Sequence, residues 1–205
     1  MKIIDLTHTF TSNMPVFPGD PKSALEQIAY IEKDSYNDHK LTTTMHVGTH
    51  MDAPLHMIAG GKSIDEIPLE RFIGQGILID ARGKKLDEKL LENVSIPKGS
   101  VFLLYTGFGD KFETEAYFKN SPVLSESLAK KLVGLKVKMV GMDIPGPDLD
   151  VPWPVHKIIL GAQIPMLENL TNLDQLLGVG NFEVIALPFK LKANGAPVRV
   201  IAEVK

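Results

Sequence analysis

Four side chains that bind metals or carry protons near neutral pH lie within eleven residues of this chain. They are His46, His50, Asp52 and His56, so this window holds three of the six histidines. Imidazole and carboxylate groups are ligands for zinc and manganese, and histidine titrates near pH 7. The spacing predicts a metal site, and the alternative is a loop held by polar contacts.

The window differs from the helical zinc-protease motif H-E-x-x-H. His46 and His50 have the same four-residue spacing, but Val47 stands where that motif has glutamate. Gly48 and Pro54 would also weaken a helix through this stretch. We therefore expect His46 near the end of a strand, followed by a tight loop.

In that arrangement Gly48 lets the chain turn, so that His50 and Asp52 return to the point at which His46 lies. Two imidazoles and one carboxylate would leave coordination positions open for water and substrate. Open positions distinguish a catalytic metal site from a closed structural one. The cluster therefore favours a catalytic site.

A second stretch places polar side chains among apolar ones. His156 precedes the apolar run 158–160, and Glu168 lies within the run 164–170. Burying a carboxylate is costly unless it is paired or coordinates a cation. The alternatives are a helix-face position for His156 and, for Glu168, the start of a helix from Thr171, where an acidic side chain is tolerated.

The remaining pattern predicts the elements that must position these groups. Apolar or β-branched runs indicate strands, proline density indicates a loop over 11–21, and Ser125 and Gly134 are typical of the start and stop of a helix. The class is α/β, with a mixed sheet curled into a barrel. The expected strands are 3–6, 25–31, 40–47, 76–81, 101–105, 137–142, 182–188 and 197–204, and the expected helices are 67–72, 86–91 and 125–133.

Composition excludes several classes of protein. The 205 residues predict one domain, 1–205, and a formal charge of −3 gives no basic surface for nucleic acid. No run of about 18 apolar residues and no signal peptide is seen, so we expect no membrane partner and a cytoplasmic location. Because the chain has no cysteine, any metal must take nitrogen and oxygen ligands.

The run His46-x-Gly48-Thr49-His50-x-Asp52-Ala53-Pro54-x-His56 resembles the signature of the metal-dependent cyclase/hydrolase family, which contains bacterial kynurenine formamidase and isatin hydrolase. The proline loop with Pro15, Pro18 and Gly19, the strand-end Asp143, and the block from His156 to Glu168 are also similar to that family. The resemblance implies a swivelling β/β/α-like fold, in which a mixed-sheet barrel has helices packed outside. It also implies a homodimer or homotetramer that acts on a small-molecule substrate.

The same resemblance implies a role for each residue. His46, His50 and Asp52 would bind a first divalent metal and His156 a second, with Asp52 and Glu168 bridging the two. His56 would be the proton donor and acceptor. One or two metal ions per subunit are implied, with zinc favoured over manganese. A metal lowers the pKa of bound water from about 15.7 toward 7, which supplies a nucleophile at neutral pH.

The implied reaction is hydrolysis of N-formylkynurenine to kynurenine and formate, a step of tryptophan catabolism. Two residues depart from that pattern: Phe17 stands where these formamidases tend to carry tryptophan against the substrate ring, and Val155 stands before His156 where they have a second histidine. A cyclic amide or lactone hydrolase similar to isatin hydrolase is the enzymatic alternative. A non-catalytic protein that binds a metal or metabolite is the alternative of another class.

Overall fold

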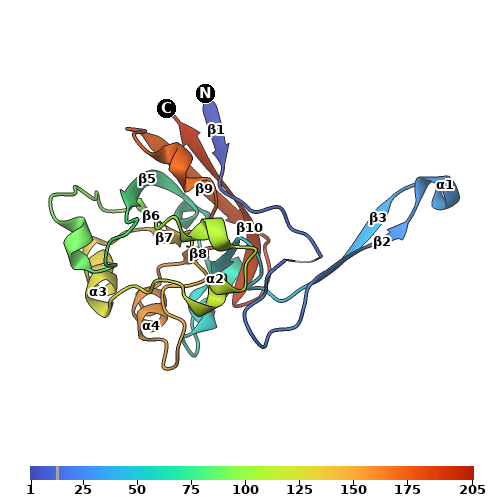
Figure 1. Cartoon of the computed structure of the whole chain (residues 1–205), viewed down its shortest axis with the longest axis horizontal. Coiled ribbons are helices and arrows are strands. Elements are labelled where there is room, and N and C mark those ends of the chain that lie inside the picture. Colours follow the sequence, from blue (N-terminus) through green and yellow to red (C-terminus); the bar gives the residue numbers. More distant parts are fainter. Residues whose placement is uncertain (13) are drawn as a thin grey trace.

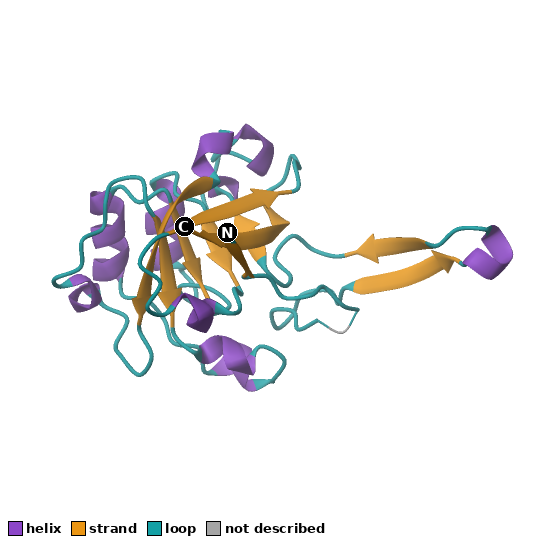
Figure 2. Ribbon diagram, turned by 90° about the horizontal axis from the view of Figure 1, so that it is seen from above, coloured by secondary structure: helices purple, strands orange, loops and turns teal. Residues whose placement is uncertain are grey.

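Eight strands form one mixed sheet that closes into a barrel. The computed structural model describes residues 1–12 and 14–205. The strand order is β1-β10-β4-β8-β7-β6-β5-β9, and β9 also pairs with β10, so seven strands form a closed ring with β1 outside it. Figure 2 shows this barrel with the helices packed around it. The strands are β1 (Lys2–Asp5), β4 (His50–Asp52), β5 (Ile73–Asp80), β6 (Val101–Tyr105), β7 (Met139–Met142), β8 (Met166–Glu168), β9 (Phe182–Pro188) and β10 (Gly195–Val204).

Strand β10 closes the barrel by pairing with a strand on each of its edges. One edge of β10 pairs with β9 from Val198 to Val204. The other edge pairs first with β4, over Gly195–Pro197, and then with β1, over 201–204. Alternate residues of β10 are small or β-branched and point into the barrel, as the two-residue period of a strand requires. Both chain termini therefore lie at this seam (Figure 1).

The parallel strands β6 and β7 are buried on both faces, as their continuous apolar runs predict. In β6, Val101 and Leu103 belong to the core inside the barrel. Phe102 and Leu104 belong to a second core beneath α3 (Glu126–Leu135) and α4 (Pro154–Gly161). The α/β class, the mixed sheet and the outer helices predicted from the sequence are confirmed.

Several predicted boundaries need correction. Ser125 caps α3 through a hydrogen bond from Leu128 N, as predicted, but the helix passes Gly134 and ends at Leu135. The C-cap residue Lys136 lies in the left-handed region, with φ 57°. The expected helices 67–72 and 86–91 are shorter 3-10 turns. The 3-10 helices are Pro54–His56, Ile64–Glu66, Leu69–Arg71, Glu88–Leu91, Phe108–Lys111 and Leu173–Leu176, and one further α-helix is α2 (Ala116–Lys119).

A long hairpin projects from the body of the molecule (Figure 1). It consists of β2 (Ala24–Ala29), α1 (Ile31–Asp34) at the tip, and β3 (Asp38–Thr42). The predicted strand 40–47 was therefore wrong at its end, because β3 stops at Thr42 and residues 43–49 return to the body without strand pairing. Over the predicted loop 11–21, the described residues form no helix or strand. Residue 13 lies outside the described residues.

Within the described part of the chain, no helix is both long and apolar enough to cross a membrane.

Candidate metal centre

Two short antiparallel strands bring the centre of the site together. In β4 and β8, His50 lies directly opposite Glu168. Met51 and Leu167 point into the barrel, so His50, Asp52 and Glu168 point to its outer face, because side chains alternate along a strand. His50 Nε2 lies 3.3 Å from both Glu168 Oε2 and Asp52 Oδ1, and all three residues are buried.

His46 reaches the same carboxylate from the unpaired segment before β4. Its Nδ1 lies 2.7 Å from Asp52 Oδ1. Gly48 has φ 63°, so the turn predicted at this glycine is confirmed. Gly195 leaves room for the ring, because a Cβ at that position would lie 2.8 Å from His46 Cε1. The expected strand position of His46 was wrong, but its convergence with Asp52 was right.

The last two histidines approach from helical segments. His156 lies in the first turn of α4, and its Nε2 is 3.4 Å from Glu168 Oε1 and 3.9 Å from Asp52 Oδ2. His56 ends the 3-10 helix Pro54–His56, with Nε2 4.0 Å from Asp52 Oδ2. The four histidines predicted to carry the chemistry therefore meet around the two predicted carboxylates, those of Asp52 and Glu168.

Three features of the cluster fit a divalent cation. His50 Nε2 and Glu168 Oε1 are buried and have no hydrogen-bond partner among the described residues. Unpaired buried polar atoms are costly, and coordination would satisfy both. Ligand atoms converge in two groups that share Asp52: one with His46 and His56, the other with His50 and Glu168. Nitrogen and carboxylate donors suit zinc or manganese.

The buried carboxylates change the titration of the histidines. Burial alone would lower the pKa of His50, but the neighbouring carboxylates of Asp52 and Glu168 raise it to about 10. Burial would also lower the pKa of His156, but the carboxylates of Asp148 and Glu168 outweigh it and raise that pKa to about 10. His46 and His50 hold the pKa of Asp52 well below its usual value despite burial. Without a metal, the imidazoles of His50 and His156 therefore carry protons that a bound cation would replace.

His56 behaves differently from these ligand-type histidines. Burial lowers its pKa, because the attraction of Asp52 and Glu168 is opposed by the neighbouring His46 and His156. His56 is therefore neutral at pH 7 and can accept a proton. Its ring lies 4.0 Å from that of His46, centroid to centroid.

Supporting residues that the sequence reasoning missed fix the orientation of the imidazoles. Asp148 accepts a hydrogen bond from His156 Nδ1–H and another from Val155 N at 2.6 Å. Such a carboxylate fixes the tautomer that leaves Nε2 free for a metal. The signal in the sequence was an aspartate eight residues before His156, on a loop whose path the sequence did not reveal.

Two side-chain amides also help to fix the orientation of the histidines. Asn169 Nδ2 donates to Gly48 O at 2.8 Å, and the same carbonyl lies 2.9 Å from His50 Nδ1. Asn194 Nδ2 lies 3.0 Å from His46 Nε2 and 3.2 Å from His56 Nδ1. These contacts hold the ring planes of three histidines.

Asp143, which directly follows β7, has a structural role. Its carboxylate accepts hydrogen bonds from Thr106 N, Thr106 Oγ1 and Gly107 N at 2.7–2.8 Å. It therefore ties the end of β7 to the turn after β6.

Aromatic side chains line one wall of the pocket beside the metal-ligand cluster. The pocket is about 340 Å³ and is lined by Phe17, Phe118, Trp153 and the site histidines. Phe17 packs edge-on against Phe118 and Trp153, with centroids 5.8 and 6.2 Å away. Phe17 thus lines the pocket beside the metal-ligand cluster, and its contact with a substrate ring stays a prediction.

Comparison with known proteins agrees with this arrangement. Residues 4–149 match the model of the family Cyclase, described as "Putative cyclase". The chain is 31% identical to kynurenine formamidase of Geobacillus thermodenitrificans over 96% of its length and 94% of that protein. Isatin hydrolase A from Labrenzia aggregata, solved with benzyl benzoate, superposes with a TM-score of 0.87 at 28% identity, covering 99% of this chain and 93% of that one. A solved potential metal-dependent hydrolase with cyclase activity gives a TM-score of 0.84 at 25% identity, covering 100% and 98%.

Proposed function

This chain belongs to the cyclase family of metal-dependent hydrolases, and from that premise we propose that it is an arylformamidase that converts N-formylkynurenine to kynurenine and formate. The observation that carries the proposal is the convergence of four histidines, Asp52 and Glu168 beside an aromatic wall. The relatives named as kynurenine formamidases support this choice of substrate.

We assign the metal ligands as His46, His50, Asp52, His156 and Glu168, with zinc favoured over manganese. Asp52 faces four imidazoles and Glu168 faces two, so either carboxylate could bridge two ions. When bound, the metal would act as a Lewis acid toward water and the formyl carbonyl. The buried, unpaired His50 Nε2 and Glu168 Oε1 support this ligand set.

His56 is the proposed proton carrier. Its pKa is lowered by burial, so the neutral imidazole can take a proton from the attacking water as the water oxygen bonds to the formyl carbon. The same proton then goes to the aryl amine as the C–N bond breaks, which releases formate. General acid–base catalysis of this kind contributes about 10²–10⁴-fold in rate.

The aromatic wall supports an aryl substrate. Phe17, Phe118 and Trp153 lie on one side of the pocket, where they can stack against a ring at the offset or edge-on distances that aromatic pairs prefer. A formamide carbonyl would then lie toward Glu168 and His56. Apolar contacts of this kind orient a substrate more than they select one amide from another.

The second candidate is a cyclic amide or lactone hydrolase. Two observations favour it: Val155 replaces the second histidine expected before His156, and the solved relatives include isatin hydrolases. The ligand set and His56 would act in the same way on a lactam carbonyl. Only the shape of the pocket around the ring would distinguish the two substrates.

The test is a panel of substrates assayed with zinc-loaded and manganese-loaded protein. N-formylkynurenine, simple aryl formamides, isatin and aryl lactones are compared by kcat/KM. We expect the highest value for N-formylkynurenine, with activity lost on chelation and restored by metal. A higher value for isatin would establish the second candidate, and no turnover of any member would contradict hydrolase function.

A further inference from the structure

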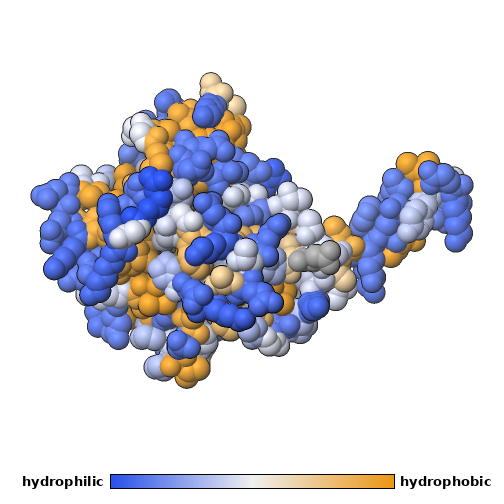
Figure 3. Space-filling model, viewed as in Figure 1, coloured by the Kyte–Doolittle hydropathy of each residue, from blue (hydrophilic) through white to orange (hydrophobic). Residues whose placement is uncertain are grey.

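Tyr117 is a fully buried tyrosine whose hydroxyl reaches the segment that follows β8. It belongs to the short helix α2, and Figure 3 shows mainly hydrophilic residues on the surface over this helix. Beneath that surface the Tyr117 ring packs against Phe108 and Phe112, with centroids 5.8 and 5.3 Å away. Burying a hydroxyl is costly unless it is hydrogen-bonded. The partner of this hydroxyl therefore indicates what the residue does.

The Tyr117 hydroxyl donates its hydrogen to a side-chain amide. It lies 2.8 Å from Asn169 Oδ1, whereas the Asp143 carbonyl is farther away, at 3.4 Å. Burial raises the pKa of the Tyr117 phenol well above its usual value, so the group keeps its hydrogen and remains a donor at neutral pH. Because an O–H donor requires the oxygen end of an amide, Tyr117 fixes which way the Asn169 amide is turned.

The nitrogen end of the same amide faces the segment that leads into β4. Asn169 Nδ2 donates to Gly48 O at 2.8 Å, and His50 Nδ1 lies 2.9 Å from that carbonyl. A His50 Nδ1–H that donates to Gly48 O leaves Nε2 free for a metal. If the amide were turned over, its oxygen would face the Gly48 oxygen, and two acceptors would repel. The orientation of His50 therefore depends on the orientation of this amide.

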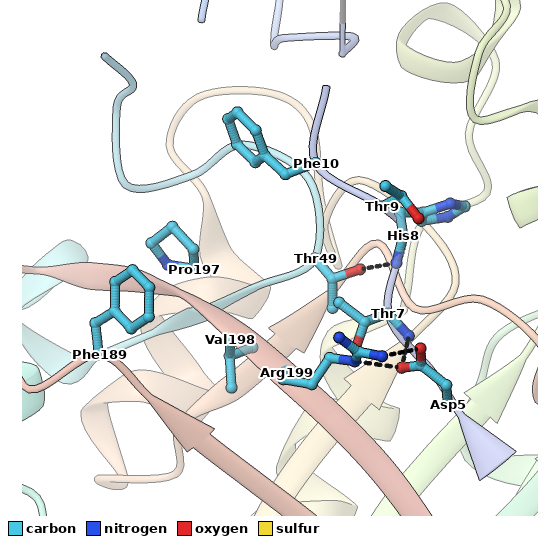
Figure 4. Close-up of a pocket in the computed structure, with 10 residues that line it drawn as sticks. All are labelled: Asp5, Thr7, His8, Thr9, Phe10, Thr49, Phe189, Pro197, Val198 and Arg199. Atoms are coloured by element: carbon cyan, nitrogen blue, oxygen red, sulfur yellow. Dashed lines mark hydrogen bonds and ion pairs between the residues drawn. The ribbon is translucent and has the colours of Figure 1, made fainter. Parts of the chain in front are cut away.

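The backbone of Asn169 is held independently of Tyr117. Its N donates to Ile144 O at 3.2 Å, and its O accepts from the Thr49 hydroxyl at 2.6 Å. Figure 4 shows that the Thr49 hydroxyl also accepts from His8 N, at 3.0 Å. Asn169 has φ 55°, a left-handed conformation in which asparagine is enriched. Only the side-chain amide of Asn169 is therefore left for Tyr117 to orient.

The ring of Tyr117 also supports the substrate pocket. It meets Phe118 edge-on, with centroids 5.2 Å apart, and Phe118 lines the aromatic wall. One residue thus contacts both the wall and the amide behind the metal-ligand cluster. A test of the hydroxyl must therefore keep the ring in place.

We propose that Tyr117 is a positioning residue for the metal centre: its hydroxyl fixes the Asn169 amide, and the amide holds His50 with Nε2 toward the metal. The inference rests on the ligand role proposed above for His50. It assigns metal binding to the hydroxyl and packing to the ring, so loss of the hydroxyl alone should weaken metal binding.

Isothermal titration of the full chain with zinc tests the inference. Tyr117→Phe keeps the ring and should weaken zinc affinity by about 10-fold, the lower end of the range for an outer partner of a ligand. Tyr105→Phe, which removes the hydroxyl of another buried tyrosine, is the matched control and should bind zinc as the wild type does. Circular dichroism should show the same fold in both variants.

A double-mutant cycle with Asn169→Gly distinguishes positioning from a general loss of stability. Glycine adopts a positive φ without strain, so this variant removes the amide and keeps the backbone conformation. If Tyr117 acts through the amide, Tyr117→Phe should change zinc affinity by less than about 2-fold in the Asn169→Gly background. An equal effect with and without the amide would overturn the inference, as would unchanged zinc affinity in Tyr117→Phe.

Nuclear magnetic resonance of zinc-loaded protein with ¹⁵N-labelled histidine gives a spectroscopic readout. The His50 Nδ1–H signal should shift in Tyr117→Phe. The signal of His156, whose Nδ1–H donates to Asp148, should stay in place as the internal reference. An unshifted His50 signal would overturn the inference while leaving the metal centre intact. A wild type that binds no zinc would instead overturn the proposed metal centre, and the inference with it.

Discussion

His50 and Glu168 occupy opposite positions on neighbouring antiparallel strands, with His50 Nε2 3.3 Å from Glu168 Oε2. Residues from the front and the back of the chain thus share one metal-ligand cluster. Because β4 also pairs with β10 and β8 also pairs with β7, the sheet itself sets the distance between these two ligands. The strand pairing that forms the barrel therefore also positions the proposed ligands, and substitution of either residue tests the metal site that this pairing builds.

Glu168→Gln should weaken metal binding while the fold persists. The amide keeps the size of the side chain but removes the negative charge that faces His50 and His156. We expect the loss of affinity to exceed the roughly 10–100-fold typical of changing an outer partner of a ligand. Isothermal titration with zinc measures it. Glu183→Gln, a glutamate of β9, is the matched control, and equal affinities in the two variants would remove Glu168 from the ligand set.

His56→Ala should separate proton transfer from metal binding. We expect metal content close to that of the wild type and a kcat lower by about 10²–10⁴-fold. His39→Ala, which changes an exposed histidine of the projecting hairpin, controls for loss of an imidazole. Because His56 Nε2 lies 4.0 Å from Asp52 Oδ2, loss of the metal in His56→Ala would instead identify it as a ligand. An unchanged rate would contradict its role as proton carrier.

Asp148→Asn should act on the metal through His156. The carboxylate accepts the His156 Nδ1–H bond and thereby presents Nε2 to Glu168. Replacing it should weaken metal affinity by about 10–100-fold, with a smaller loss of rate once metal is saturating. Asp150→Asn, on the same loop and exposed, should leave both unchanged. Equal behaviour of the two variants would show that Asp148 does not orient the ring.

Metal binding should release protons and strengthen with pH. The pKa values of metal-free His50 and His156 are about 10, so both rings are protonated at neutral pH, and coordination requires the neutral form. Affinity should therefore rise as the pH increases from 6 toward 9, with about two protons released per site at pH 7. Titration in buffers of different ionisation enthalpy counts them. No proton release would contradict the raised pKa values.

The sequence predicted the longer barrel strands and the side chains that converge in the metal-ligand cluster. The apolar run 101–105 and the closing strand 197–204 follow the predicted ranges closely, because burial on both faces or strict alternation leaves a clear pattern. The window from His46 to His56 concentrates ligand side chains that few other structures require. The residue types of the site were therefore easier to predict than the elements that position them.

The elements that position the ligands were harder to predict. β4 and β8 have three residues each and contain the polar ligands themselves, so neither shows a strand pattern. β3 ends at Thr42 because the projecting hairpin rejoins the body there, and a run of threonines does not reveal where strand pairing stops. Asp148 becomes a partner of His156 only through the path of the loop before α4.

Anomalous diffraction at the zinc edge, from crystals of the zinc-loaded protein, tests the central claim most directly. We expect a strong peak within coordination distance, about 2.0–2.2 Å, of His50 Nε2 and the carboxylates of Asp52 and Glu168. If crystals grown from fully active protein showed no peak between these three residues, or showed zinc bound only elsewhere, the proposed metal centre would be contradicted.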